Sequence, residues 1–115
     1  MDISSLQAAG VNVDNVLDRC MGNKDLVLKL FDKFLHDQNY MALKTAIDSE
    51  DIESALAASH TLKGVCANLA FDNLYKLFSH QVDLIRQGSW PKAVSLMGQI
   101  DKEYCNLSNA IKNII

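Results

Sequence analysis

The fold is decided by the stretch AVSLMGQIDKEYCNLSNAIKNI, residues 93–114. Its large apolar side chains recur in alternating steps of four and three residues, without a break, from Ala93 to Ile114. That spacing places them on one face of an α-helix. So regular a face is typical of helices that pack antiparallel in a bundle, and it predicts that the partners of this helix lie earlier in the chain.

The rest of the chain shows the same helical spacing, and its proline and the glycines at 10, 22 and 88 lie where helices could begin or end. No stretch combines sustained apolar–polar alternation with β-branched residues, so a sheet is not expected. The predicted fold class is all-α, an antiparallel up-down four-helix bundle with short N-terminal helices. We expect one domain over residues 1–115, with short helices in 1–22 and bundle helices over 24–48, 50–70, 72–88 and 90–113. Asn23 and Ser89 are the expected N-caps of the first and last bundle helices.

The composition excludes several classes of protein. With 49% hydrophobic and 22% charged residues, the 115-residue chain is expected to fold around one core. A net charge of −3 with scattered Lys and Arg argues against nucleic-acid binding. No apolar run approaches the roughly 20 residues that span a bilayer, and residues 1–5 do not resemble a secretory signal. We therefore expect a cytoplasmic protein that binds neither membrane nor nucleic acid.

Potential metal and thiol sites are equally sparse. Cys20, Cys66 and Cys105 are far apart and form no Cys-x-x-Cys pair, so we expect reduced, packed thiols. Glu-x-x-His pairs, which di-iron bundles use, do not occur. The sequence therefore predicts no metal site.

One short motif combines three chemical properties within a single helical turn: His60-Thr61-Leu62-Lys63-Gly64. On a helix with about 100° between residues, His60 lies roughly 120° from the centre of the apolar face and leans outward. Lys63 lies nearer the edge of the core, and Gly64 points to solvent. Such a lysine stabilises a developing anion and disfavours protonation of the imidazole, which favours a nucleophilic histidine.

The competing interpretation is that His60 is an ordinary surface histidine. A glycine inside a helix costs about 1 kcal/mol relative to alanine, so its presence beside His60 indicates that something large approaches there. His36 and His80 have no lysine and glycine in the following turn. We therefore interpret those two as ordinary surface or boundary residues.

Residues 58–69, ASHTLKGVCANL, resemble the signature of histidine-containing phosphotransfer (HPt) domains of two-component phosphorelays. The run from Val16 through Gly22-Asn23 to Phe31 and Phe34 is similar to the first half of that family, so the resemblance covers most of the chain.

The resemblance implies a specific role for each residue of the motif. His60 would accept a phosphoryl group from the phospho-aspartate of one receiver domain and pass it to the aspartate of another. Lys63 would stabilise the charge of the phosphohistidine, and Gly64 would leave room for the receiver. The implied protein is a phosphocarrier without autokinase activity, and the sequence has no phosphate-binding Gly-x-x-x-x-Gly-Lys motif.

The resemblance also implies the partners. These are receiver domains of response regulators and a hybrid sensor histidine kinase, and we expect the protein to act as a monomer. It would need no cofactor of its own, since Mg²⁺ belongs to the receiver. The residues expected to contact a receiver are Glu53, Ala57, Ala67 and Asn68.

Two positions depart from the family pattern. Ala70 stands where the family usually has a glycine, and Val82 stands where it often has a Gln or Glu that orients the imidazole. Gln81 is next to Val82, and we expect it to orient His60. The departures leave open an alternative, a non-catalytic HPt-like module that docks on a receiver or kinase and regulates it.

Overall fold

The computed structural model describes residues 3–115; residues 1–2, which begin the expected N-terminal segment, lie outside the described part. The described chain forms eight α-helices and no named strand, so the predicted all-α class is confirmed. The helices are α1 (Ile3–Ala8), α2 (Val13–Arg19), α3 (Lys24–Leu35), α4 (Asn39–Asp48), α5 (Ile52–Asn68), α6 (Asp72–Arg86), α7 (Trp90–Ser95) and α8 (Met97–Lys112). Within residues 3–115, no helix is long and apolar enough to cross a membrane.

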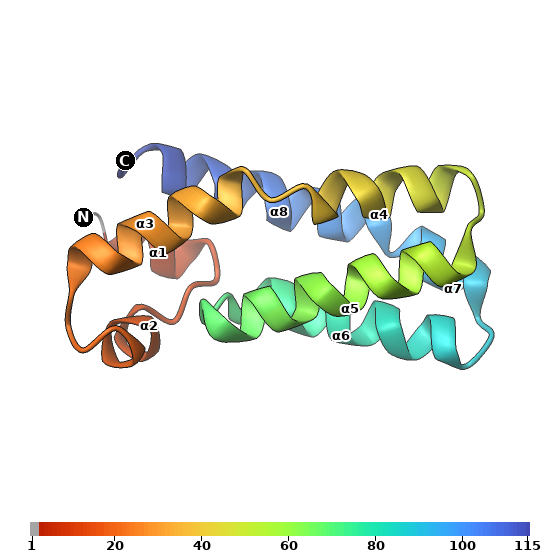
Figure 1. Cartoon of the computed structure of the whole chain (residues 1–115), viewed down its shortest axis with the longest axis horizontal. Helices are drawn as coiled ribbons and strands as arrows, with labels where there is room; N and C mark the ends of the chain where they lie inside the picture. Colours follow the sequence, from red (N-terminus) through yellow and green to blue (C-terminus); the bar gives the residue numbers. More distant parts are fainter. Residues whose placement is uncertain (1–2) are drawn as a thin grey trace.

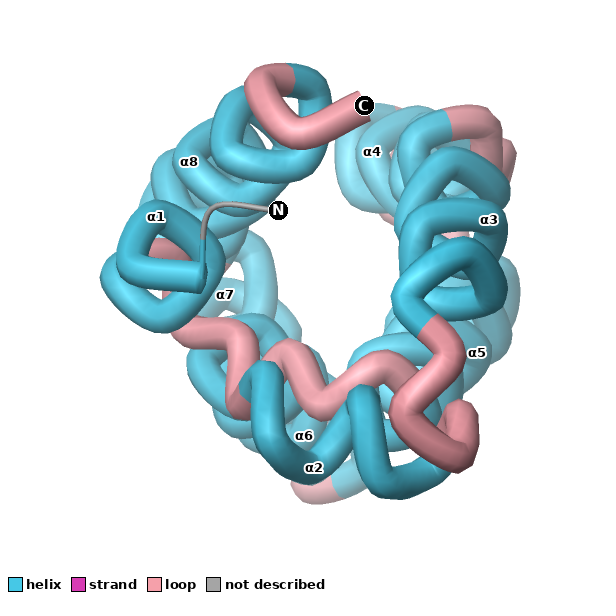
Figure 2. Tube along the Cα trace, turned by 90° about the vertical axis from the view of Figure 1, so that its left-hand side faces the viewer, coloured by secondary structure: helices cyan, strands magenta, loops and turns pink. Residues whose placement is uncertain are grey.

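The helices line up along the long axis of an elongated molecule of 41 × 22 × 21 Å. In Figure 1, α3 and α4 follow one another along one side, α5 runs back, α6 returns, and α7 and α8 run back again. Viewed along that axis in Figure 2, they surround a common interior, with α1 and α2 at one end. Helix α5 packs against both α4 and α6, so one face of α5 remains on the surface.

The apolar face of residues 93–114 lies in the core. Ala93, Ile100, Leu107 and Ile111 are at most 1% exposed. Aromatic rings join this face to the other helices, as the ring of Tyr104 lies 5.3 Å from that of Phe34 on α3. Burial of these side chains is the main source of stability for the bundle.

The first predicted long helix, 24–48, is not continuous. It ends at Leu35 and begins again at Asn39. His36 directs its Nδ1 at the Asp32 carbonyl oxygen, 2.9 Å away, while the Asp37 carboxylate accepts from the backbone N–H of Asn39 at 2.8 Å. These side chains take over the backbone partners that a continuous helix would use, which produces the break.

The last predicted helix, 90–113, is also divided, because α7 ends at Ser95 and α8 begins at Met97. The Ser95 hydroxyl donates to the carbonyl oxygen of Pro91, four residues earlier, at 3.0 Å. A side chain bonded to the preceding turn in this way tends to bend a helix.

The central helices are slightly shorter than the predicted 50–70 and 72–88. Asp51 precedes α5 and caps it by accepting from the backbone N–H of Ser54 at 3.1 Å. The Ser54 hydroxyl and N–H both donate to Asp51, which lowers the pKa of this carboxyl group. Helix α6 ends at Arg86, two residues before Gly88.

The capping predictions had different outcomes. Asn23 caps α3 as predicted, accepting from the N–H of Leu26 at 3.1 Å. Ser89 occupies the N-cap position of α7 but makes no capping hydrogen bond with its side chain.

The turn between α5 and α6 contains Ala70, at the position where the family pattern usually has a glycine. Ala70 has a φ of +58°, in the left-handed region where a glycine costs least. The N–H of Phe71 donates to the carbonyl oxygen of Cys66 at 2.9 Å, which closes the end of α5. Ala70 therefore makes the turn that a glycine would make there, with some backbone strain.

Candidate functional site

The motif residues occupy the surface of α5 that the sequence predicted. His60 and Gly64 are exposed and Lys63 is half-buried, whereas Ala55, Leu62 and Cys66 on the opposite face are fully buried. Within the described residues, neither His60 nor Lys63 makes a side-chain hydrogen bond or an ion pair. The imidazole is therefore open to a molecule that approaches α5 from solvent.

Gly64 is not required by packing inside the bundle. A Cβ atom built at Gly64 meets no heavy atom within 4 Å outside its immediate neighbours. The missing side chain leaves open space on the surface, four residues after His60. The same turn of α5 thus combines an accessible imidazole with open space on the surface.

A shallow surface hollow surrounds the imidazole. It is lined by Glu53, Leu56, Ala57, His60 and Thr61 of α5 and by Arg86 of α6. Two of the predicted contact residues, Glu53 and Ala57, thus lie in the same hollow as His60. Arg86 was missed by the sequence analysis because no helical periodicity within α5 reports which residue of α6 lies beside it.

The prediction that Gln81 orients His60 is wrong. Gln81 is fully buried, and its Oε1 accepts from the hydroxyl of Ser59 at 2.8 Å. Its Nε2 donates to the Ala93 carbonyl oxygen at 3.1 Å and lies 3.2 Å from Met97 Sδ. Because Ser59 faces the core and His60 faces outward, a side chain that bonds Ser59 is directed away from the imidazole. Val82 is buried as well.

The other two predicted contacts lie beyond Gly64 toward the end of α5. Ala67 is half-buried, and its carbonyl oxygen accepts from the guanidinium of Arg19 on α2 at 2.8 Å. Asn68 is exposed and lines a second depression, between α3 and α5. The predicted contact residues therefore form two groups, one around His60 and one beyond Gly64.

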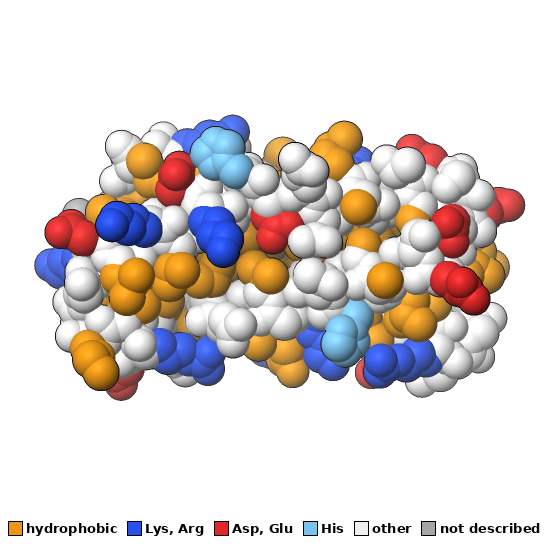
Figure 3. All heavy atoms as spheres, in the orientation of Figure 1, with side chains coloured by type: hydrophobic (Ala, Val, Ile, Leu, Met, Phe, Trp, Pro, Cys, Tyr) orange, Lys and Arg blue, Asp and Glu red, His pale blue; other side chains and the backbone are white. Residues whose placement is uncertain are grey.

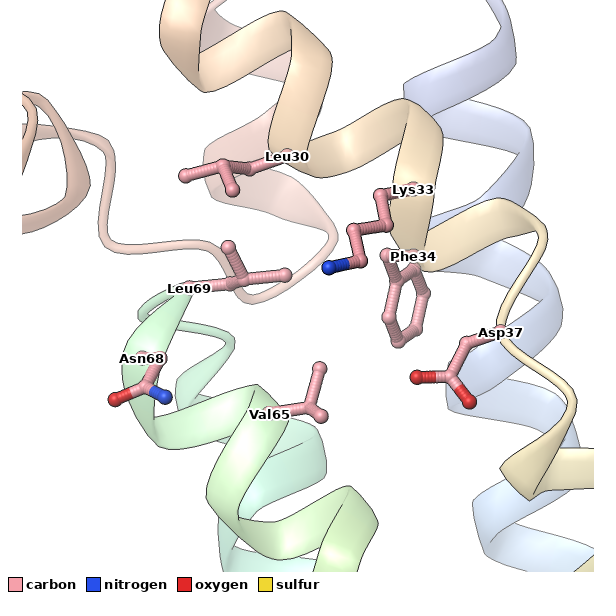
Figure 4. A pocket seen from close by; sticks show the side chains of 7 residues that line it. All are labelled: Leu30, Lys33, Phe34, Asp37, Val65, Asn68 and Leu69. Atoms are coloured by element: carbon pink, nitrogen blue, oxygen red, sulfur yellow. The ribbon is translucent and has the colours of Figure 1, made fainter.

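Figure 4 shows this second depression, with Asn68, Val65 and Leu69 on the α5 side facing residues of α3 and the break that follows it. Most of the side chains that line it are apolar, and Lys33 and Asp37 add one charge of each sign. The depression extends the accessible surface of the motif along α5 and adds apolar area to it.

Figure 3 shows the face of the molecule that carries α4 and α5. Acidic side chains gather at its right-hand end, near the turn between these helices, and Lys and Arg side chains lie over its left half and lower edge. Uncharged side chains cover much of the middle. A mostly uncharged surface ringed by charge is typical of protein–protein interfaces.

The remaining candidate groups lie elsewhere. His36 is engaged with Asp32 of its own helix, and His80 lines a hollow formed with α7 and α8. Cys20 and Cys66 are buried as expected, but Cys105 is exposed. Among residues 3–115, no three His, Cys, Asp or Glu side chains are grouped to hold a metal ion.

Comparison with known proteins gives one family. A family model described as the Hpt domain matches residues 34–110. The match includes the whole of α5 with His60, Lys63 and Gly64, and it includes α6 with Arg86. No curated protein and no solved structure gave a significant match.

Proposed function

Since the chain belongs to the Hpt domain family, we propose that His60 is the residue that carries the phosphoryl group. Hpt domains serve histidine phosphotransfer in two-component signalling and interact with receiver domains and kinases. The observation that carries the proposal is the exposed, unpaired His60 within the matched residues, with Lys63 and Gly64 in the following turn. His36 and His80 lack this arrangement.

In the proposed relay, the unprotonated ring nitrogen of His60 attacks the phosphorus of a receiver's aspartyl phosphate. An N–P bond forms, the P–O bond to the aspartate breaks, and the carboxylate leaves with the electron pair. The second ring nitrogen keeps its proton or releases it to water. In the next step a carboxylate of another receiver attacks the phosphorus, and the electron pair of the N–P bond returns to the imidazole.

Positioning and charge stabilisation supply most of the catalysis in such a transfer. Lys63 is close enough along α5 to stabilise the charge on the phosphoryl group, and Gly64 leaves room for the receiver surface. We propose that Glu53, Ala57, Ala67 and Asn68 contact the receiver. The carrier needs no cofactor of its own, because Mg²⁺ and the acidic pocket belong to the receiver.

The proposal also covers the arrangement of the helices and the place of the protein in the relay. We infer an antiparallel up-down four-helix bundle, which the alternating course of α3–α4, α5, α6 and α7–α8 in Figure 1 supports. The protein acts as a monomeric cytoplasmic phosphocarrier without autokinase activity, between a hybrid sensor kinase and response regulators.

The decisive experiment is transfer of radiolabelled phosphate from a panel of phosphorylated receiver domains to the purified protein. The expected label is labile to acid and stable to base, as a phosphohistidine is. His60→Gln abolishes it, while His36→Gln and His80→Gln retain it. Equal labelling of His60→Gln and the parent protein would refute the assignment.

One observation favours a second function, a docking module that regulates a receiver or kinase without carrying phosphate. The α6 residues at the family's orienting position are turned inward, so neither Gln81 nor Val82 reaches the imidazole. This alternative predicts receiver binding that is unchanged in His60→Ala, together with no phosphotransfer by the parent protein.

A further inference from the structure

The turn between α2 and α3 exposes an apolar side chain that the fold does not require. Met21 is 95% exposed, more than any other large hydrophobic side chain among residues 3–115. Its φ is +54°, in the left-handed region that glycine adopts at the least cost. Neither packing nor backbone conformation explains a methionine there, whereas a flexible thioether is well suited to contact another protein.

Met21 lies at one end of a strip of apolar side chains along α3 and α5. On α3, Leu26 is 41% exposed, and Leu30, one turn later, lines the depression of Figure 4. On α5, Val65 and Leu69 line the same depression. We call these five residues the apolar strip. In Figure 3, hydrophobic side chains gather over this seam in the left half of the face.

Hydrogen bonds hold α2 against the end of α5. Arg19, the last residue of α2, donates from its guanidinium to the carbonyl oxygen of Ala67 at 2.8 Å. The backbone N–H of Asn12, which precedes α2, donates to the carbonyl oxygen of Ala70 at 2.8 Å. The α2–α3 turn is therefore fixed beside the end of the helix that carries His60.

The depression in the middle of the strip suits an apolar side chain of a partner. Its volume is about 190 Å³, and Phe34, which is only 2% exposed, closes it from the core side. Lys33 and Asp37 contribute one charge of each sign, so the lining has no net charge that would attract an acidic or a basic segment. A buried apolar anchor in such a pocket is a common centre of binding energy.

The strip lies within reach of a domain that docks on His60. Leu69 is nine residues after His60, which corresponds to about 14 Å along the axis of α5. A protein–protein interface of standard size buries about 800 Å² on each partner, a patch roughly 30 Å across. A receiver domain that reaches the imidazole therefore also covers the depression and comes up to the α2–α3 turn. This continuity favours a receiver, rather than a second copy of the chain, as the occupant of the strip.

We propose that the α2–α3 turn and the first turn of α3 extend the docking surface for the receiver, and that Met21 and Leu26 determine which receivers bind. Both residues lie outside residues 34–110, the part matched to the family. The inference rests on the proposed function, because the partner is the receiver that exchanges phosphate with His60. A receiver with apolar side chains facing the strip binds, whereas one with a charged side chain there is rejected, because its charge would be buried without a partner.

The test measures label transfer from phosphorylated receiver domains as a function of receiver concentration, which separates KM from kcat. The variants are Met21→Asn and Leu26→Gln. Asparagine tolerates the left-handed conformation, so Met21→Asn keeps the turn while it removes the apolar side chain. Met41→Gln is the matched control, because Met41 is 63% exposed on α4 and lies outside the strip.

The expected result is weaker binding with unchanged chemistry. Each strip variant raises KM for the preferred receiver by about fivefold and leaves kcat within about twofold of the parent value. Receivers that the parent protein uses poorly are affected less, so the preference among receivers narrows, and Met41→Gln behaves as the parent protein. Phosphoramidate labels every variant at the parent rate, since this small donor needs no docking surface. In that reaction the N–P bond of the reagent breaks, an N–P bond to the imidazole forms, and ammonia leaves.

The possible failures are distinguishable. If no receiver gives label that His60→Gln removes, the proposed function fails, and this inference fails with it. If His60 is labelled but Met21→Asn and Leu26→Gln keep the parent KM for every receiver, only the role of the strip is refuted. An equal rise in KM for Met41→Gln refutes it as well. A parent protein that sediments as a dimer, with Met21→Asn as a monomer, would show that a second copy occupies the strip instead.

Discussion

Gly64 shows how one missing side chain separates stability from function. The glycine lies inside α5, yet a Cβ there has open space around it. Alanine would therefore suit the helix better by about 1 kcal/mol. A residue that weakens its own helix without helping the packing is best explained by a partner that must come close.

The first prediction follows from this conflict. Gly64→Ala raises the free energy of unfolding by about 1 kcal/mol, because the helix is favoured and nothing clashes. The same methyl group lies where the receiver approaches, so transfer to His60 slows by about tenfold. Urea denaturation measures the first effect, and the initial rate of label transfer measures the second.

Gly98 provides the control for this prediction. It is also an exposed helical glycine with open space around its Cβ position, but it lies on α8. Gly98→Ala should leave the transfer rate unchanged. If Gly64→Ala transferred as fast as the parent protein, the role of Gly64 in receiver access would be wrong.

At the scale of the helices, the bond between Ser59 and Gln81 gives the site its geometry. It crosses the interface between α5 and α6, and the same amide reaches the Ala93 carbonyl oxygen of α7. A buried polar group needs its partners, because an unsatisfied one costs about 1–3 kcal/mol. Gln81 therefore fixes how these three helices meet, although it does not touch His60.

The second prediction is energetic coupling between these two residues. Gln81→Leu lowers the free energy of unfolding by about 2 kcal/mol, because Ser59 and Ala93 lose their partner. Ser59→Ala lowers it by less. In the double variant the losses are not additive, with a coupling energy of about 1 kcal/mol. Urea denaturation of the four proteins tests this, and strictly additive losses would contradict it.

The helices also show where sequence patterns stop being informative. Apolar spacing gave the all-α class and the buried face of α8, because burial imposes that spacing directly. The breaks at His36–Gln38 and Leu96 depend on single side chains that bond the backbone, and spacing does not report them. The side chains of Asp37 and Ser95 form these hydrogen bonds with the backbone, so they are the residues in the sequence that could have indicated the two breaks.

The difference between single-helix patterns and contacts between helices also explains which site residues the sequence predicted correctly. His60, Lys63 and Gly64 lie on one helix, so the helical period alone gave their directions. Gln81 was assigned wrongly and Arg86 was missed because both depend on how α6 is rotated against α5. That rotation is set by the Ser59–Gln81 bond and by packing across the whole interface.

At the scale of the whole molecule, the closed core determines the response to alkaline pH. Cys66 lies on α5 two residues after Gly64, but on its inner face, with no exposed surface. Burial, with a smaller contribution from the charge of Asp37, raises the pKa of this thiol from its ordinary value of 9.0 to about 12. Burial also raises the pKa of Tyr104.

The third prediction is the direction of the pH dependence. Above about pH 9 the unfolded chain loses the Cys66 proton while the folded protein keeps it, so ionisation favours unfolding. The contribution of Cys66 to stability is intact below pH 9 and is lost as the pH rises toward about 12, by up to about 1.4 kcal/mol per pH unit. Cys66→Val keeps a similar volume without a titrating group, so its stability declines less steeply over this range.

Urea denaturation of the parent protein and of Cys66→Val at about pH 8 and about pH 11 measures the difference. Burial, the main cause of the raised pKa of Tyr104, is the same in both proteins, so most of the gap between the two slopes belongs to Cys66. Cys105→Val is the matched control: Cys105 is exposed, and its replacement should leave the slope as it is in the parent protein. Parallel declines in the parent protein and Cys66→Val would show that the thiol ionises as easily in the folded state, and hence that the core beneath the His60 surface admits water.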